Sequence, residues 1–491
     1  MSTTIPSGSL IHAEDGARAL RTMPFIACLN LAICANFLFV AGHDRQRIAE
    51  LLVLAGIGIC AVMFRPNACA AMFTGATGRA LVAFFLLGAV SSAFAFKPLY
   101  GLFEVAAFFM LYLCATLVGD DIARNGRVAI VLPVQLLALG CTLHTVHFAF
   151  AYYTDFALHL PLSVDDFTRG FSNIRFFNHA QTTILPLFIL LLCLTPRTSK
   201  LKWLWMGITT YWWMAAYATS ARGTLIGLAA GCAIAAMVAR ARAVPYLRCV
   251  ALTAALGLIA YFVILVAVPA AFGVEGMHSF WDTAVRTAVD PTSARDKLWN
   301  RALSLIVQHP WLGAGPMHFA HHAGDLHTGA HPHDILIQII AEWGMPALIV
   351  LLVAVGLGLR ALVRTGKHIP AGDTDNQTIF AALLVGAGAI LVDGLVSGIF
   401  VMPQSQLGVA LYLGCAMGWR RLVVPAAAHE MPQHAARPIM TASVVAAIVA
   451  IVAAVSMDVP AKWRGDNLTP AQRAANTGDV LSPRLWTAGF F

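Results

Sequence analysis

Long apolar runs separated by short polar segments dominate the chain. The runs lie near residues 23–41, 48–64, 80–96, 99–118, 128–150, 181–195, 201–219, 223–239, 249–273, 335–358, 378–401, 405–419 and 437–457. A helix needs about 20 apolar residues to cross the hydrocarbon core of a bilayer. Because open sheets leave backbone groups unpaired in lipid, the pattern predicts an all-α polytopic membrane protein with 12 or 13 transmembrane helices.

The placement of cations along the chain predicts its orientation. With the N-terminus in the cytoplasm and the spans alternating, most Lys and Arg residues fall on cytoplasmic segments. The short outer connections hold only Arg45, Arg47, Lys97 and Arg222. Cytoplasmic loops of membrane proteins carry an excess of Lys and Arg, so this orientation is expected. The first run follows Arg18 and Arg21 without a convincing cleavage site, which is typical of a retained signal anchor.

This topology divides the chain into five parts. A cytoplasmic tail covers 1–22, and helices 1–9 lie within 23–273 with an outer loop at 152–180. A large outer loop covers 274–333, helices 10–13 lie within 334–457, and an outer tail covers 458–491. Since a long loop with its own turn signals usually has a function, we expect the chemistry on the outer face.

Composition agrees with a bilayer as the solvent. Apolar residues make up 59% of the 491 residues and charged residues only 11%, whereas soluble domains carry about 25% charged residues. This excludes a disordered protein, a nucleic-acid-binding module and an ordinary soluble enzyme. The ten cysteines lie in or beside apolar runs without a CxxC pair, which speaks against a disulfide framework or a zinc ribbon. The chain also lacks the phosphate-binding motif of an ATPase.

The large outer loop contains the most unusual polar pattern. Residues 293–306 predict an amphipathic helix, and its Arg295 and Arg301 can flank one pocket although they are six residues apart. A turn-rich break at 309–316 ends this helix. A histidine-rich stretch follows, with His318, His321, His322, His327, His331 and His333.

Polar residues continue into the next predicted span. Asp334 is a candidate N-cap, and Asp334, Gln338 and Glu342 recur every four residues on an otherwise apolar helix. In lipid such a stripe must face the bundle or a wet cavity. The free N–H groups at the start of this helix favour an anion nearby.

Two further arginines lie at the outer border. Arg222 lies in a very short outer connection between two spans, and Arg175 precedes the sixth span. A guanidinium there is costly unless it meets an anion, and its planar fork suits phosphate oxygens. Together the arginines predict a pocket for a di-anionic lipid head group, and a neutral histidine beside it can remove a proton from a hydroxyl.

Simpler interpretations of these residues remain open. Interfacial arginines often extend their charge to water, and Arg295 and Arg301 can belong to a solvated helix face. Asp334 can be a cap alone and Glu342 a structural hydrogen-bond partner. The histidine tract can hold a metal, but it has no HExxH spacing and no nearby cysteine, so we predict no metal site. His333 is preferred over His331 as the base because it adjoins the capped helix.

These motifs resemble the signature of the O-antigen ligase and polymerase superfamily. The matching segments are HPWLGAG at 309–315 and HPHDILIQIIAEWG at 331–344, against a family pattern of roughly hP-x-x-G-x-G … H-N-x-x-L-Q-x-x-x-E-x-G. SAR at 293–295 with Trp299 and SARG at 220–223 are similar to the family's other marks. Asp334 replaces the usual Asn, and both residues cap helices. The helix at 437–457 and the outer tail also depart from the usual ligase topology.

The resemblance implies a glycosyltransferase on the periplasmic face of a Gram-negative inner membrane, with a GT-C-like helical fold. Its donor is a glycan on undecaprenyl diphosphate, its acceptor is lipid A–core, and transfer inverts the anomeric carbon without a metal or other cofactor. His333, or alternatively His331, would be the catalytic base. Arg222 and Arg295, with Arg301 and Arg175 in second rank, would bind the diphosphate, supported by Asp334, Gln338 and Glu342.

Two alternatives remain. An O-antigen polymerase or a protein O-oligosaccharyltransferase of the same superfamily would use the same pocket with another acceptor. A lipid or anion transporter would need charges near the middle of the bilayer. Apart from Glu104 and Asp393 the spans contain almost none, which argues against transport.

Overall fold

The computed structural model describes residues 24–38, 42–66, 72, 75–279, 285, 288–289, 295–326, 329–424, 433–464 and 486. The described residues form helices and turns and contain no β-strand, which confirms the predicted all-α fold. The predicted tail at 1–22 and most of the tail at 458–491 lie outside these residues.

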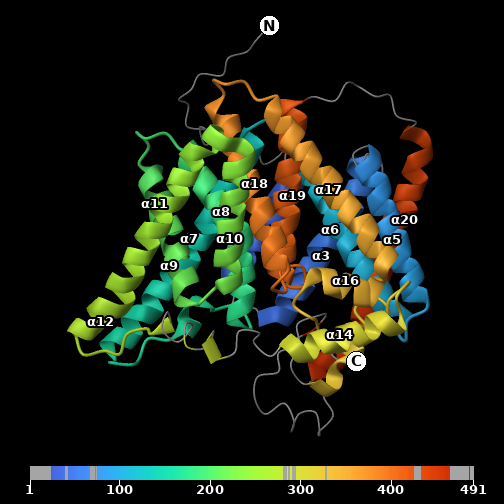
Figure 1. The fold of residues 1–491 in the computed structure, drawn as a ribbon, viewed down its shortest axis with the longest axis horizontal. Coiled ribbons are helices and arrows are strands. Elements are labelled where there is room, and N and C mark those ends of the chain that lie inside the picture. Colours follow the sequence, from blue (N-terminus) through green and yellow to red (C-terminus); the bar gives the residue numbers. More distant parts are fainter. Residues whose placement is uncertain are drawn as a thin grey trace.

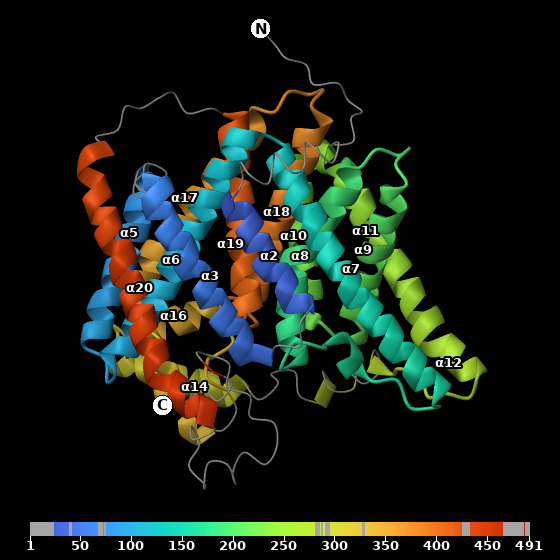
Figure 2. The ribbon, with the colours of Figure 1, turned by 180° about the vertical axis from the view of Figure 1, so that it is seen from behind.

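The long helices form a bundle in which they run between two ends (Figures 1 and 2). They are α2 (Pro24–Leu38), α3 (Gly42–Phe64), α5 (Gly75–Ala93), α6 (Pro98–Asn125), α7 (Val128–Ala157), α8 (Ile174–Leu194), α9 (Leu201–Ala218), α10 (Arg222–Ala239), α11 (Val244–Ala260), α17 (Met345–Lys367), α18 (Thr374–Gly394), α19 (Pro403–Val423) and α20 (Gln433–Arg464). The shorter elements are η1 (Val164–Phe167), η2 (Arg240–Ala243), η3 (Tyr261–Ala267), α12 (Val268–Ala271), α14 (Arg295–Gln308), α15 (Phe319–His322), η4 (Gly324–Leu326) and α16 (Ile335–Trp343).

Each predicted apolar run is largely helical, and the runs at 249–273 and 335–358 each cover more than one helical element. By length and composition, nine helical stretches of the described chain can cross a membrane, and α2, α9 and α19 fall outside this group. One of the nine, Arg222–Ala271, contains two long helices, α10 and α11, and the short elements η2, η3 and α12. Arg240 between the two long helices has φ of 52°, and the chain reverses between α10 and α11 (Figure 1). The chain is therefore a multi-pass membrane protein.

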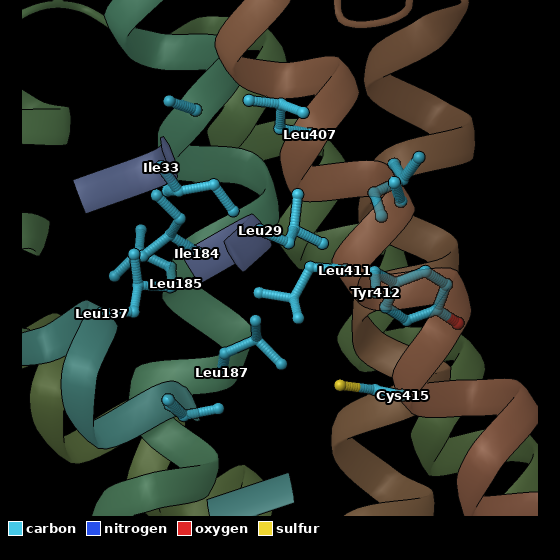
Figure 3. Packing of buried hydrophobic residues seen from close by; sticks show 14 of the residues in the cluster. Leu29, Ile33, Leu137, Ile184, Leu185, Leu187, Leu407, Leu411, Tyr412 and Cys415 are labelled. Atoms are coloured by element: carbon cyan, nitrogen blue, oxygen red, sulfur yellow. The ribbon is translucent and has the colours of Figure 1, made fainter. Parts of the chain in front are cut away.

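The core of the bundle lies where α2, α7, α8 and α19 meet. Figure 3 shows Leu29, Leu137, Leu185 and Leu411 from these four helices with their side chains directed toward one another. All four are completely buried. This apolar packing holds α8 and its first turn in place relative to the other helices.

Helices α10 and α18 approach each other closely because glycines line the contact. A Cβ atom added to Gly227 would lie 2.7 Å from the carbonyl oxygen of Ala389, and one added to Gly231 would lie 2.2 Å from that of Val385. Small residues at four-residue spacing allow such close packing of membrane helices. The contact brings the start of α10 beside the end of α18.

The predicted span at 335–358 is wrong in one respect, because two helices replace it. Gly344 has φ of 86° and separates α16 from α17. A Cβ atom on this residue would lie 2.1 Å from the carbonyl oxygen of Trp311, so the preceding loop packs against the break. Helix α16 therefore stays at the end of the bundle near α14 and does not continue the span (Figure 1).

Gly344→Ala is expected to lower stability by about 1–3 kcal/mol, because alanine would have to adopt a left-handed conformation against Trp311. Gly356→Ala is a matched control within α17, where an added Cβ meets nothing within 4 Å. The control should leave stability unchanged or raise it by up to about 1 kcal/mol. Thermal unfolding of both variants in detergent would check this, and equal melting temperatures would contradict it.

The two ends of the bundle differ in charge. We call the end that carries α14 the α14 end and the other the basic end. Cations on the basic end are Arg65, Arg79, Arg124, Arg127, Arg197, Lys200, Lys202, Arg240, Arg242, Arg248, Arg360, Arg364, Lys367, Arg420, Arg421 and Arg437. The predicted cytoplasmic segments thus gather at one end, as a consistent alternation of spans requires.

Candidate functional site

A cavity of about 270 Å³ opens at the α14 end, and we call it the arginine cavity. Its walls come from the first turn of α8, the α9–α10 connection, the end of α18 and the loop before α16. Its lining comprises Val164, Ile174, Arg175, Asn178, His179, Ala218, Thr219, Ser220, Ala221, Arg222, Gly223, Thr224, Ser279, Arg295, His333, Asp393, Val396 and Ser397. Segments far apart in sequence therefore form one polar site.

Three arginines reach this cavity from the starts of three helices. Arg175 is the second residue of α8, Arg222 the first of α10 and Arg295 the first of α14. Free backbone N–H groups and the helix dipole add partial positive charge at each of these positions. Arg175, Arg222 and Arg295 therefore line one cavity.

Local turns explain why these arginines occupy helix starts. The side chain of Asn173 caps α8 and accepts a hydrogen bond from the backbone N–H of Arg175 at 2.8 Å. Helix α9 ends at Ala218, and Ser220, with φ of 54°, lies in the three-residue connection that reverses the chain before Arg222. A short, tight connection thus holds Arg222 at the rim of the bundle.

The electrostatics of the cavity favour an anion. Burial lowers the pKa of Arg295, and the nearby charges of Arg175 and Arg222 lower it further. The buried Nε of Arg295 has no hydrogen-bond partner among the described atoms. A bound anion would supply an acceptor and reduce the repulsion among the three cations.

His333 lies at the edge of this cationic site. It is half-buried, and its φ of 58° is one of the few left-handed values at a residue other than glycine. Burial and the charges of Arg295, Arg175 and His179 hold the pKa of His333 well below its usual value of 6.5. His333 is therefore neutral at pH 7 and can accept a proton.

His331 is a neighbour of His333 outside the cavity lining. Its ring is completely buried, and its centroid lies 4.0 Å from that of the His333 ring. Its Nδ1 accepts a hydrogen bond from the backbone N–H of His333 at 3.2 Å. These contacts suit a residue that positions His333, so the geometry favours His333 between the two candidate bases.

Arg301 does not share the cavity with Arg295, so the prediction that both flank one pocket is wrong. Six residues further along α14 the helix has turned by about 240°. The guanidinium of Arg301 donates hydrogen bonds to the carbonyl oxygen of His322 and to the carboxylate of Asp325, the latter at 2.7 Å. Arg301 thus connects α14 to the end of α15 and to η4.

The polar stripe of Asp334, Gln338 and Glu342 supports the site from outside the cavity. Asp334 caps α16 through Oδ1, which accepts hydrogen bonds from the N–H groups of Leu336 at 2.8 Å and the next residue at 3.1 Å. Glu342 accepts a hydrogen bond from the N–H of Phe319 at 2.9 Å, and Gln338 is buried. The stripe therefore lies on a short helix packed against α14, and the prediction that it belongs to a spanning helix is wrong.

Asp393 is a site residue to which the sequence analysis assigned no role. It is 1% exposed, and its Oδ2 accepts a hydrogen bond from Thr182 at 2.7 Å and lies 3.8 Å from Nδ1 of His179. The close packing of Gly223 brings it to the start of α10. An ionisable residue inside an apolar span is itself a signal of function, and this signal could have identified it.

The histidine-rich stretch makes separate structural contacts. His318 accepts a hydrogen bond from the N–H of Lys97 at 2.9 Å, and the His321 ring stacks on Phe96. Within the described part of the chain, no group of three or more His, Cys, Asp or Glu residues is placed to hold a metal ion. His327 lies outside the described residues.

Comparison with known proteins identifies the segment that holds most of this site. Residues 207–352 match the family model Wzy_C, described as O-antigen ligase. The match covers 146 of the 491 residues, so this segment is similar to the O-antigen ligase family. Members of this family are glycosyltransferase-like enzymes, so a ligase- or polymerase-type reaction in a multi-pass bacterial membrane protein is supported. None of the curated proteins matches the chain.

The matched segment of the O-antigen ligase family contains Arg222, Arg295 and His333. Arg175 and Asp393 lie outside it and reach the arginine cavity through α8 and α18. The cavity therefore combines the family segment with helices that precede and follow it.

Proposed function

We propose that this protein is an O-antigen ligase. It transfers a glycan from undecaprenyl diphosphate to the lipid A–core oligosaccharide. The reaction takes place on the periplasmic side of a Gram-negative inner membrane. The observation that carries the proposal is the convergence of Arg175, Arg222, Arg295 and His333 on one cavity, within a chain that has a segment similar to the O-antigen ligase family.

The three arginines bind the diphosphate of the donor. Guanidinium groups form paired hydrogen bonds with phosphate oxygens, and three of them match a group with at least two negative charges. As the bond between the anomeric carbon and the diphosphate oxygen breaks, negative charge grows on the leaving group. Groups already held in place stabilise that charge without reorganisation. The three arginines therefore stabilise the leaving diphosphate.

His333 acts as the general base of the transfer. A hydroxyl of the acceptor sugar attacks the anomeric carbon from the face opposite the diphosphate, and its proton moves to the ring of His333. The diphosphate leaves with the electron pair of the broken bond, so the anomeric configuration inverts. Asp393 and His179 line the cavity beside these groups.

The orientation of the bundle supports a periplasmic site. The cations collect at the basic end, and loops rich in Lys and Arg face the cytoplasm. The α14 end then faces the periplasm together with the arginine cavity.

The pH dependence of kcat/KM for the donor is expected to show an acid limb below pH 6.5. Only neutral His333 accepts a proton, and the pKa of His333 is lowered from 6.5, so activity should be constant near pH 7 and fall in acid. Arg295→Gln removes a neighbouring positive charge and should move this limb to higher pH. An acid limb centred above 6.5 in the unaltered protein would contradict the assignment.

Transfer by the purified protein tests the proposed reaction directly. Donor lipid is supplied with lipid A–core, with a peptide or with a second donor molecule as acceptor, each with and without a chelator. The proposal expects product only with lipid A–core and no loss of activity with chelator. Product with the donor alone or with the peptide would instead identify a polymerase or a protein O-oligosaccharyltransferase.

A further inference from the structure

A second cavity, of about 370 Å³, lies at the basic end of the bundle. Its polar lining comprises Thr77 of α5, Arg360, Arg364 and Thr365 of α17, the adjoining His368 and Arg420 of α19. No carboxylate is among the lining residues. Three guanidinium groups from two helices therefore surround one hollow, at the opposite end from the arginine cavity.

Four other arginines at this end have acidic partners. Arg65, Arg124 and Arg421 all approach Asp120, at 3.3, 2.7 and 3.9 Å. Arg127 likewise pairs with Asp373 at 2.6 Å. Among the described residues, Arg360, Arg364 and Arg420 form no such pair. The second cavity thus keeps its positive charge where neighbouring arginines are neutralised.

The arrangement of these side chains favours a bound anion. Arg360 and Arg364 are one helical turn apart on α17, where like charges repel each other. The Nε atom of Arg420 is buried and has no hydrogen-bond partner among the described atoms. Because buried donors are nearly always paired, this N–H points to an acceptor from outside the chain.

The surface of α17 indicates the kind of ligand. Ile349, Val353 and Leu357 follow one another at four-residue spacing toward the cavity. Ile349 and Val353 are each about half exposed, so this side of α17 faces lipid. An acyl chain along this stripe would place its phosphate among the arginines, and guanidinium groups suit phosphate oxygens. Basic pockets between helices on the cytoplasmic side bind anionic head groups.

We propose that the second cavity binds the phosphate of an anionic phospholipid from the cytoplasmic leaflet. The inference uses the orientation given by the cations but does not depend on the transfer reaction. Its ligand differs from the donor lipid, since the two cavities lie at opposite ends of the bundle. Occupation would join α17 and α19 at the end far from the arginine cavity and stabilise the bundle.

Thermal unfolding in detergent with added lipids tests this site. Phosphatidylglycerol, phosphatidylcholine and inorganic phosphate are titrated against the unaltered protein and the Arg364→Gln/Arg420→Gln variant. Since one direct arginine–phosphate pair at a partly exposed site contributes roughly a fivefold change in affinity, the double variant should bind phosphatidylglycerol about 25-fold more weakly. The Arg197→Gln/Arg248→Gln variant removes equal charge from the basic end outside the cavity and should bind as the unaltered protein does.

Each outcome decides the proposal. An equal loss in both double variants would show a diffuse charge effect and overturn it, and so would a shift from inorganic phosphate as large as that from phosphatidylglycerol. If the double variant does not fold, Arg364→Lys keeps the charge but loses the planar fork, and should still weaken phosphatidylglycerol binding. Native mass spectrometry of the unaltered protein provides an independent count of retained anionic lipid, and no retained lipid would also overturn the proposal.

Discussion

Replacing His333 with alanine is expected to reduce glycan transfer about 10²- to 10⁴-fold, the usual contribution of a general base. The loss should appear in kcat, because the arginines that bind the diphosphate remain in place. Binding of the donor should therefore change little. Single-turnover transfer by purified protein, together with a donor-binding titration, would separate the two effects.

His321→Ala is the matched control for this variant. His321 lies at the same end of the bundle, stacks on Phe96 and does not line the arginine cavity. It should retain nearly full activity. If His333→Ala folds normally and still transfers glycan at the unaltered rate, another group is the base and the proposed mechanism is wrong.

Replacing Arg222 or Arg295 with alanine is expected to reduce kcat/KM for the donor about 10²- to 10³-fold, as loss of a group that stabilises developing charge does. Lysine at either position should restore only part of the activity, because it keeps the charge but not the paired hydrogen bonds. Steady-state kinetics with varied donor would measure both effects.

Arg301→Ala provides a control on the same helix as Arg295. Its guanidinium pairs with Asp325 on the other side of α14, so its loss should affect folding stability modestly and leave donor KM unchanged. Equal kinetic losses in the Arg295 and Arg301 variants would contradict the assignment of the arginine cavity as the diphosphate site.

The amino-acid sequence by itself determined the helical membrane fold and the positions of most of its long helices. An open strand cannot pair its backbone groups in lipid, so apolar length alone predicts most of the long helices. The amphipathic pattern also predicted α14, on which Leu298, Ala302 and Leu305 are buried. Likewise the Asp334 cap follows from local hydrogen bonding, which depends only on near neighbours.

Only the tertiary structure decided which charged residues share a cavity. Arg295 and Arg301 look equivalent in sequence, but the helix directs one into the arginine cavity and the other to Asp325. Asp393 enters the site only because Gly223 and Gly227 let α10 and α18 approach closely.

The break at Gly344 likewise depends on the loop that packs against it. Apolar length and periodicity depend only on whether a residue contacts lipid and on which face of its own helix it lies. The direction of a side chain toward a distant partner depends on how the helices pack, which no local pattern contains.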